Sequence, residues 1–124
     1  MTAPTERGKM LLAVTNSIVG LHREHYGRGA TRGRTILQDD YLVCFLEDIY
    51  TKAERTLIEA GSFTAVHESR EAFQSAMETR FSASVQAITG RRVKAFLSQV
   101  RADPDVAVEA FWLEPETEAV DRLD

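Results

Sequence analysis

Hydrophobic residues recur at helical spacing near the start of the chain. Five of them, three or four positions apart, define one helical face: Leu11, Val14, Ile18, Leu21 and His25. This spacing predicts a first helix from Thr5 to Tyr26. Gly27 follows it, where helices often end with a residue in the left-handed conformation.

The pattern then changes to alternation, which is typical of strands. Residues 31–37 and 41–47 flank the turn-forming residues 38–40, and this arrangement predicts a hairpin. The second run is apolar on both of its faces, with Tyr41, Val43 and Phe45 on one and Leu42, Cys44 and Leu46 on the other. A two-layer fold needs only one apolar sheet face, so we expect a second subunit to cover the other.

Two further helices are indicated by their caps and stripes. Thr51 and Glu54 have the spacing of a capping box, and Gly61 ends the short helix that follows, with Leu57 and Ile58 facing inward. Residues 62–89 carry the longest helical stripe, which Gly90 ends. Its members are Val66, Phe73, Met77, Phe81, Val85 and Ile88.

A second hairpin completes the domain. The runs RRVKAFLSQV and VAVEAFWL flank RADPD, whose Asp-Pro pair favours a turn. The order α-β-β-α-α-β-β predicts an α+β fold, with a mostly antiparallel four-stranded sheet and the helices on one face. We expect one domain over residues 1–115 and a frayed acidic tail over residues 116–124.

Composition and charge narrow the class of protein. The 124 residues suffice for one domain with a real core, and no apolar run approaches the roughly 20 residues that span a bilayer. The net charge of −4 argues against a general nucleic-acid binder. The single Cys44 lies in an apolar run, so we expect a buried thiol, no internal disulfide and a cytoplasmic location.

The arginine-rich stretch GRGATRGR leaves two interpretations open. Its glycines follow a helix and lead into a strand, whereas a phosphate cradle follows a strand and opens a helix. The stretch is therefore either a structural linker or a surface for a partner or an anion. The candidate residues of that surface are Arg28, Arg32, Arg34, Arg91 and Arg92.

No recognised arrangement for catalysis, metal binding or a cofactor is present. His22 and His25 are three residues apart, whereas the zinc-protease pattern needs histidines four apart. We interpret His25, on the apolar stripe, as a half-buried structural residue. We predict no catalytic residue, no metal and no cofactor, although an enzyme of unrecognised type stays a third hypothesis.

Several short motifs, in this order, resemble those of one bacterial family over residues 8–114. They are Gly27-Arg28-Gly29; Thr51 with Glu54, Leu57 and Gly61; Arg70; Thr89-Gly90-Arg91 with Val93; and Phe111-Trp112-Leu113. This is the MpsC-like family, named for the third component of a Na+-translocating membrane-potential-generating system and formerly a domain of unknown function. The sequence departs at Ala30, where the family often has proline, and around Ser98-Gln99, where a common acidic residue is absent.

The resemblance implies a non-enzymatic accessory or regulatory protein of that system, with a membrane-protein partner and a place at the inner face of the plasma membrane. The alternative is a small RNA- or anion-binding module that uses the arginines above. From the residues themselves we expect a homodimer, with no direct membrane insertion and no nucleic acid in the favoured hypothesis. The structural positions are Gly27, Gly29, Thr51, Glu54, Gly61 and Gly90, and the interface candidates are Tyr41, Val43, Phe45, Phe96 and Trp112.

Overall fold

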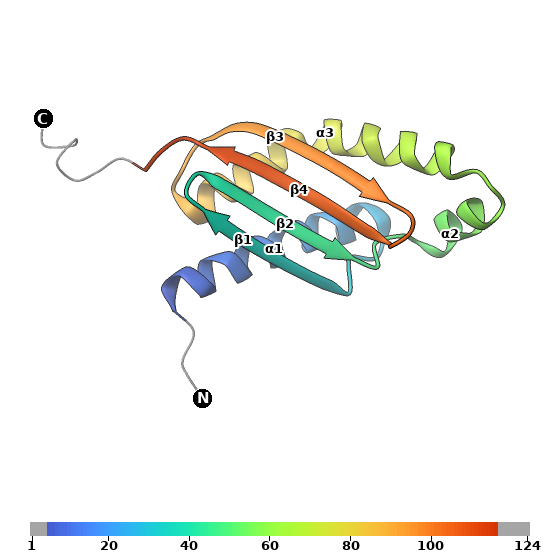
Figure 1. Cartoon of the computed structure of the whole chain (residues 1–124), viewed down its shortest axis with the longest axis horizontal. Coiled ribbons are helices and arrows are strands. Elements are labelled where there is room, and N and C mark those ends of the chain that lie inside the picture. Colours follow the sequence, from blue (N-terminus) through green and yellow to red (C-terminus); the bar gives the residue numbers. More distant parts are fainter. Residues whose placement is uncertain (1–4, 117–124) are drawn as a thin grey trace, which may run out of the picture.

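The computed structural model describes residues 5–116 as three helices and one four-stranded antiparallel sheet (Figure 1). The elements are α1 (Glu6–Tyr26), β1 (Arg32–Gln38), β2 (Tyr41–Glu47), α2 (Lys52–Glu59), α3 (Phe63–Thr89), β3 (Val93–Arg101) and β4 (Val106–Leu113). Their order confirms the predicted α+β arrangement. The predicted tail lies, beyond Glu116, outside the described residues.

The two hairpins join into one sheet with the order β1-β2-β4-β3. The strands β2 and β4 are therefore central, and β1 and β3 form the edges. Helices α1 and α3 pack against each other and against the same face of the sheet, so the domain has two layers. In Figure 1 the four strands lie in front of these helices, and their near face carries no helix.

The core fills the space between the sheet and the helices. Leu42, Cys44 and Leu46 point from β2 into it and are fully buried, as are Ile18 of α1 and Phe81 of α3. Burying a side chain of this size stabilises the fold by roughly 1.5–3 kcal/mol. The expectation that Cys44 is a buried free thiol is confirmed.

Two expectations about helix faces are wrong. On α1 the buried histidine is His22, four residues after Ile18, whereas His25 is exposed. On α2, Ile58 is half-buried but Leu57 is exposed, because this short helix packs only on α3 at the end of the molecule. In both cases the spacing of the residues is compatible with burial of either of two adjacent helix faces. The position of the packing partner determines which face is buried.

Glycines end the helices or allow close approach. Gly27, Gly61 and Gly90 have φ angles of 78°, 83° and 72°, which L side chains rarely adopt. A Cβ on Gly29 would lie 2.6 Å from a methyl carbon of Val19, so only glycine lets this loop pass so close to α1. Within residues 5–116, no helix combines the length and the apolar character that crossing a bilayer requires.

The predicted capping box of α2 is present. The backbone N–H of Glu54 donates to the Thr51 hydroxyl at 3.1 Å, and the backbone N–H of Thr51 donates to the Glu54 carboxylate at 2.9 Å. These two bonds satisfy amide groups that the first turn of a helix leaves without partners.

We expect Thr51→Ala to lower the free energy of unfolding by about 1 kcal/mol, because the cap at the start of α2 is lost. Urea unfolding followed by circular dichroism measures the change. Thr56→Ala is the matched control, since the Thr56 hydroxyl bonds only a carbonyl within the same helix. Equal effects of the two substitutions would contradict the role of the cap.

Candidate functional site

The sheet face turned away from the helices, here called the outer face, is not covered by any element of the described chain. Residues that pair across neighbouring strands share a face, so the strand register sorts its side chains into four rows. The rows are Arg32, Glu47, Val106, Arg101; then Arg34, Phe45, Val108, Gln99; then Ile36, Val43, Ala110, Leu97; and then Gln38, Tyr41, Trp112, Ala95.

The centre of the outer face is apolar and open to solvent. Among residues 5–116, seven large hydrophobic side chains are exposed, and five of them lie on this face. Those five are Ile36 (44% exposed), Tyr41 (56%), Phe45 (43%), Leu97 (71%) and Trp112 (45%). Exposed apolar side chains gathered on one surface indicate a site of interaction.

The interface residues that we predicted from the sequence separate into two groups. Tyr41, Val43, Phe45 and Trp112 all lie on the outer face. Phe96 faces the helices instead, with its ring 5.8 Å from that of Phe81 and 5.1 Å from that of Phe111. A register shift between Val93 and Ala95 sets this phase, and the sequence pattern did not reveal it.

The two ends of the outer face differ in character. At one end, Trp112 lies between the ring of Tyr41, at a centroid distance of 6.3 Å, and the ammonium group of Lys94, 4.1 Å from the indole. At the other end, Glu47 lies in the same row as Arg32 and Arg101. The face therefore has an aromatic end, an aliphatic centre and a charged end.

The arginines of the predicted anion surface do not come together. Arg28, Arg32 and Arg34 lie on or before β1, with Arg32 at its start. Arg91 and Arg92 precede β3, near the end of β1 and thus about 20 Å away along the strands. Figure 1 shows these two regions at opposite ends of the sheet.

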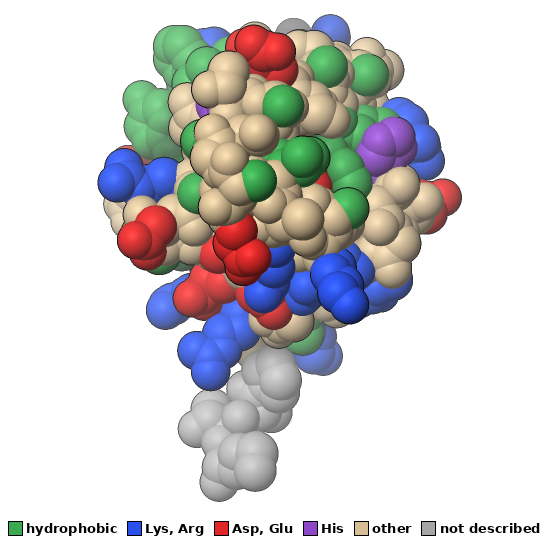
Figure 2. Space-filling model, turned by 90° about the vertical axis from the view of Figure 1, so that its right-hand side faces the viewer, with side chains coloured by type: hydrophobic (Ala, Val, Ile, Leu, Met, Phe, Trp, Pro, Cys, Tyr) green, Lys and Arg blue, Asp and Glu red, His purple; other side chains and the backbone are tan. Residues whose placement is uncertain are grey.

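Arg28 takes part in an ion-pair network near α2. It donates to the Asp48 carboxylate at 2.9 Å and to the Tyr50 carbonyl at 3.1 Å, and Arg55 also pairs with Asp48. The hydrogen bond from Thr31, with those from the two arginines, holds the pKa of Asp48 below its usual 3.8. Figure 2 looks onto this end of the molecule and shows acidic and basic side chains intermingled there.

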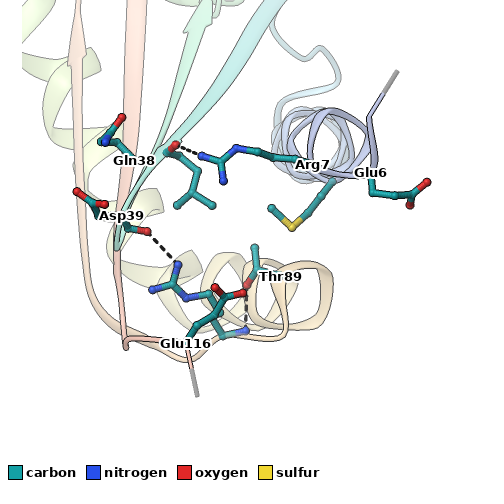
Figure 3. A pocket seen from close by; sticks show the side chains of 9 residues that line it. Glu6, Arg7, Gln38, Asp39, Thr89 and Glu116 are labelled. Atoms are coloured by element: carbon teal, nitrogen blue, oxygen red, sulfur yellow. Dashed lines mark hydrogen bonds between the residues drawn. The ribbon is translucent and has the colours of Figure 1, made fainter. Parts of the chain in front are cut away.

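A hollow of about 530 Å³ lies at the opposite end of the sheet (Figure 3). Arg7 and Arg91 line it, but Arg7 donates to the Leu37 carbonyl and Arg91 to the carbonyls of Asp39 and Glu114. Arg91 also pairs with the Asp40 carboxylate. Arg91 therefore links the β1–β2 turn to the segment after β4. Its guanidinium N–H groups are engaged in these hydrogen bonds and are not free to bind an anion.

Arg70 of α3 is 1% exposed and binds the start of α2. Its Nε donates to Glu54 Oε2 at 2.7 Å, and its Nη2 donates to the Ile49 carbonyl at 3.0 Å. The guanidinium group also lies 3.7 Å from the centre of the Tyr26 ring. One side chain thus joins α3, α2 and the end of α1, and its charge is paired and hydrogen-bonded.

A second buried ionisable pair joins α1 to the central strand β4. His22 Nε2 lies 3.6 Å from Glu109 Oε1, and the two residues are 4% and 0% exposed. His22 Nδ1 lies 2.8 Å from the Ile18 carbonyl and must donate to it, because a carbonyl only accepts. Nε2 therefore remains free to interact with the Glu109 carboxyl group.

Two other titratable side chains near Glu109 carry no charge at neutral pH. Burial raises the pKa of the Cys44 thiol to about 11 and that of the Tyr26 hydroxyl to about 12, so both are neutral at pH 7. Within residues 5–116, neither carboxylate oxygen of Glu109 has a hydrogen-bond partner. A buried carboxyl group without a polar partner is unfavourable, and His22, 3.6 Å away, is the polar side chain placed to compensate it.

Sequence reasoning missed Glu109, and a signal for it exists. Glu109 alternates with Ala107, Phe111 and Leu113, which are buried, so an inward carboxylate follows once β4 is assigned. Arg70, noted only as a family motif, also lies on the buried stripe of α3. Within the described part of the chain, no group of three or more His, Cys, Asp or Glu residues is placed to hold a metal ion.

Comparison with known proteins gives one family. A family model described as Na+-translocating membrane potential-generating system (MpsC) matches residues 6–115. This match covers nearly the whole described chain and includes the residues of the outer face and both buried pairs. No curated protein and no solved structure matches the chain.

We expect His22→Leu to lower the free energy of unfolding by about 1–3 kcal/mol, because it leaves the buried Glu109 carboxyl group without a polar partner. Adding Glu109→Leu should restore part of this loss, since it removes the buried polar group. Urea unfolding of the wild type, both single variants and the double variant measures the coupling. A strictly additive cycle would show that the two side chains do not interact.

The Arg70–Glu54 pair predicts a pH dependence. Burial raises the pKa of Glu54, but the hydrogen bonds from Arg70 and from the Thr51 N–H outweigh burial and hold that pKa below its usual 4.5. The ionised carboxylate therefore stabilises the fold above pH 4.5, and this stabilisation is lost as the pH falls through the lowered value.

Urea unfolding at stepped pH values should show this directly. Glu54→Gln should be less stable than the wild type at pH 7 and should lose less stability than the wild type below pH 4.5. Glu59→Gln is the control, because Glu59 is an exposed residue of the same helix. Parallel pH profiles for Glu54→Gln and the wild type would exclude the proposed contribution.

Proposed function

The chain belongs to the MpsC family, and from this we propose that it is a non-enzymatic accessory or regulatory protein of a bacterial Na+-translocating, membrane-potential-generating system. It acts by binding other proteins through its surface. In this proposal the protein lies in the cytoplasm, at the inner face of the plasma membrane, where it contacts the membrane components of the system.

The observation that carries this proposal is the outer face. Five large hydrophobic side chains are exposed on it, each by at least 43%. A chain that works alone gains nothing from such a surface, because exposed apolar groups promote association. Protein–protein contact is therefore the function that this surface serves.

Two of the five candidate arginines and both buried ionisable pairs are occupied within the fold. Arg28 and Arg91 bind carboxylates and carbonyls of the chain itself. The pairs Arg70–Glu54 and His22–Glu109 lie under the helices, where they join secondary-structure elements. These contacts favour a binding protein over the RNA- or anion-binding alternative.

The test is made in a strain that lacks the chain. We expect a reduced membrane potential, measured with a potential-sensitive dye, and restoration by the wild-type protein. Leu97→Glu should fail to restore it, because the substitution places a charge on the outer face. Leu12→Glu should restore it, because Leu12 is also exposed to solvent but lies on α1.

A membrane potential that does not change on deletion would overturn the proposal. If both variants fail to restore the membrane potential at normal protein levels, the outer face is not the surface that the function requires. The protein level of each variant is measured in the same cells, so that loss of the protein is not mistaken for loss of function.

A further inference from the structure

We propose that a second copy of this chain covers the outer face, so that two sheets pack face to face around a twofold axis. This inference rests on the proposed function only in treating the outer face as the binding surface, and it names the occupant of that surface. The membrane components would then bind the pair of chains at other surfaces.

The size of the outer face suits such a contact. Four strands about 4.8 Å apart, with about seven residues rising 3.3 Å each, cover roughly 19 by 23 Å. The accessible area of a pleated surface with side chains exceeds this flat projection. The flat projection alone is roughly 440 Å², about half of the roughly 800 Å² that each partner buries in a standard interface, and the exposed side chains add to it.

The outer face is also complementary to itself. A twofold axis parallel to the strands, between β2 and β4, places β1 over β3 of the second copy and β2 over its β4. Ile36 then faces Leu97 of the second copy, and Val43 faces its Ala110. Aligned packing within about 30° is one of the two ways in which sheets stack.

The neighbouring rows follow the same symmetry. Phe45 faces Val108 of the second copy, and Tyr41 faces its Trp112, so that aromatic rings meet at one end of the interface. Every large apolar side chain of the outer face thereby meets an apolar side chain. A partner of unrelated sequence would have to supply this pattern independently.

The charges of the outer face lie at its rim and make the contact sensitive to salt. The axis brings Arg32 near Arg101 of the second copy, with Glu47 of the same row between them. Four basic side chains, Arg32, Arg34, Lys94 and Arg101, outnumber the one acid. Added salt screens this repulsion, so it should strengthen self-association, whereas it would weaken binding of an acidic partner.

Light scattering on the purified chain after size exclusion tests the occupant. We expect a mass of twice 13.9 kDa for the wild type, and at low protein concentration the fraction of dimer should rise as salt is added. Leu97→Glu and Val43→Glu should give monomers. Leu12→Glu and Leu57→Glu, exposed on α1 and α2, should stay dimeric and serve as matched controls.

Each variant is first checked by circular dichroism. Leu97 is 71% exposed on an edge strand, so Leu97→Glu keeps the fold even where Val43→Glu does not. A wild-type monomer at high protein concentration would overturn the proposal. A dimer that survives Leu97→Glu and Val43→Glu with the fold intact would overturn it as well.

Cross-linking tests the arrangement. We expect a short bis-maleimide to join Ile36→Cys to Leu97→Cys when the two variants are mixed, giving a band of doubled mass on a denaturing gel. Neither variant alone should form this band, because like residues lie on opposite sides of the axis. The native Cys44 is fully buried and does not interfere. Cross-linking of each variant alone, without the mixed product, would exclude this axis.

These measurements use purified protein, so their failure is distinct from failure of the proposed function. If the wild type is a monomer but Leu97→Glu still fails to restore the membrane potential, the outer face binds a different protein. If the wild type is a dimer but its deletion leaves the membrane potential unchanged, the proposed dimer stands and the proposed function is wrong.

Discussion

The constraint that governs this molecule is that its sheet is apolar on both faces while its helices cover only one. The strand β2 shows it most directly, with Leu42, Cys44 and Leu46 under the helices and Tyr41, Val43 and Phe45 on the other side. The covered face gives the chain its stability. The uncovered face packs against no other element of the described chain, and so it is available for contact with another protein.

Two buried polar pairs hold the covered layer in place. The hydrophobic effect is non-directional, so it specifies the position of a helix on a sheet less sharply than a polar pair does. His22–Glu109 fixes α1 over the central strand β4, and Arg70–Glu54 fixes α2 against α3. The hydroxyl groups of Thr15 and Thr35, 2.7 Å apart, add a third link between α1 and β1. These polar contacts fix the positions of α1 on the sheet and of α2 against α3.

The sequence was sufficient for the elements that local chemistry determines. The capping box at Thr51, the glycine after each helix and the alternation of β2 are signals within a few residues, and the structure confirms each of them. Features that depend on distant partners were harder to predict. The strand order, the burial of His22 rather than His25 and the inward turn of Phe96 follow from which element packs where. The same applies to the site, where β2 and Trp112 marked the outer face but Glu109 was overlooked.

The edges of the sheet carry a further consequence. The edge strands β1 and β3 present Arg32, Arg34, Lys94 and Arg101, and charged side chains on an edge oppose the addition of further strands. Growth from chain to chain along the hydrogen-bonding direction, which leads to fibres, is thereby disfavoured. A twofold contact between two outer faces buries the exposed apolar surface of both chains at once. Assembly of this chain would then stop at a closed pair, however much protein the cell contains.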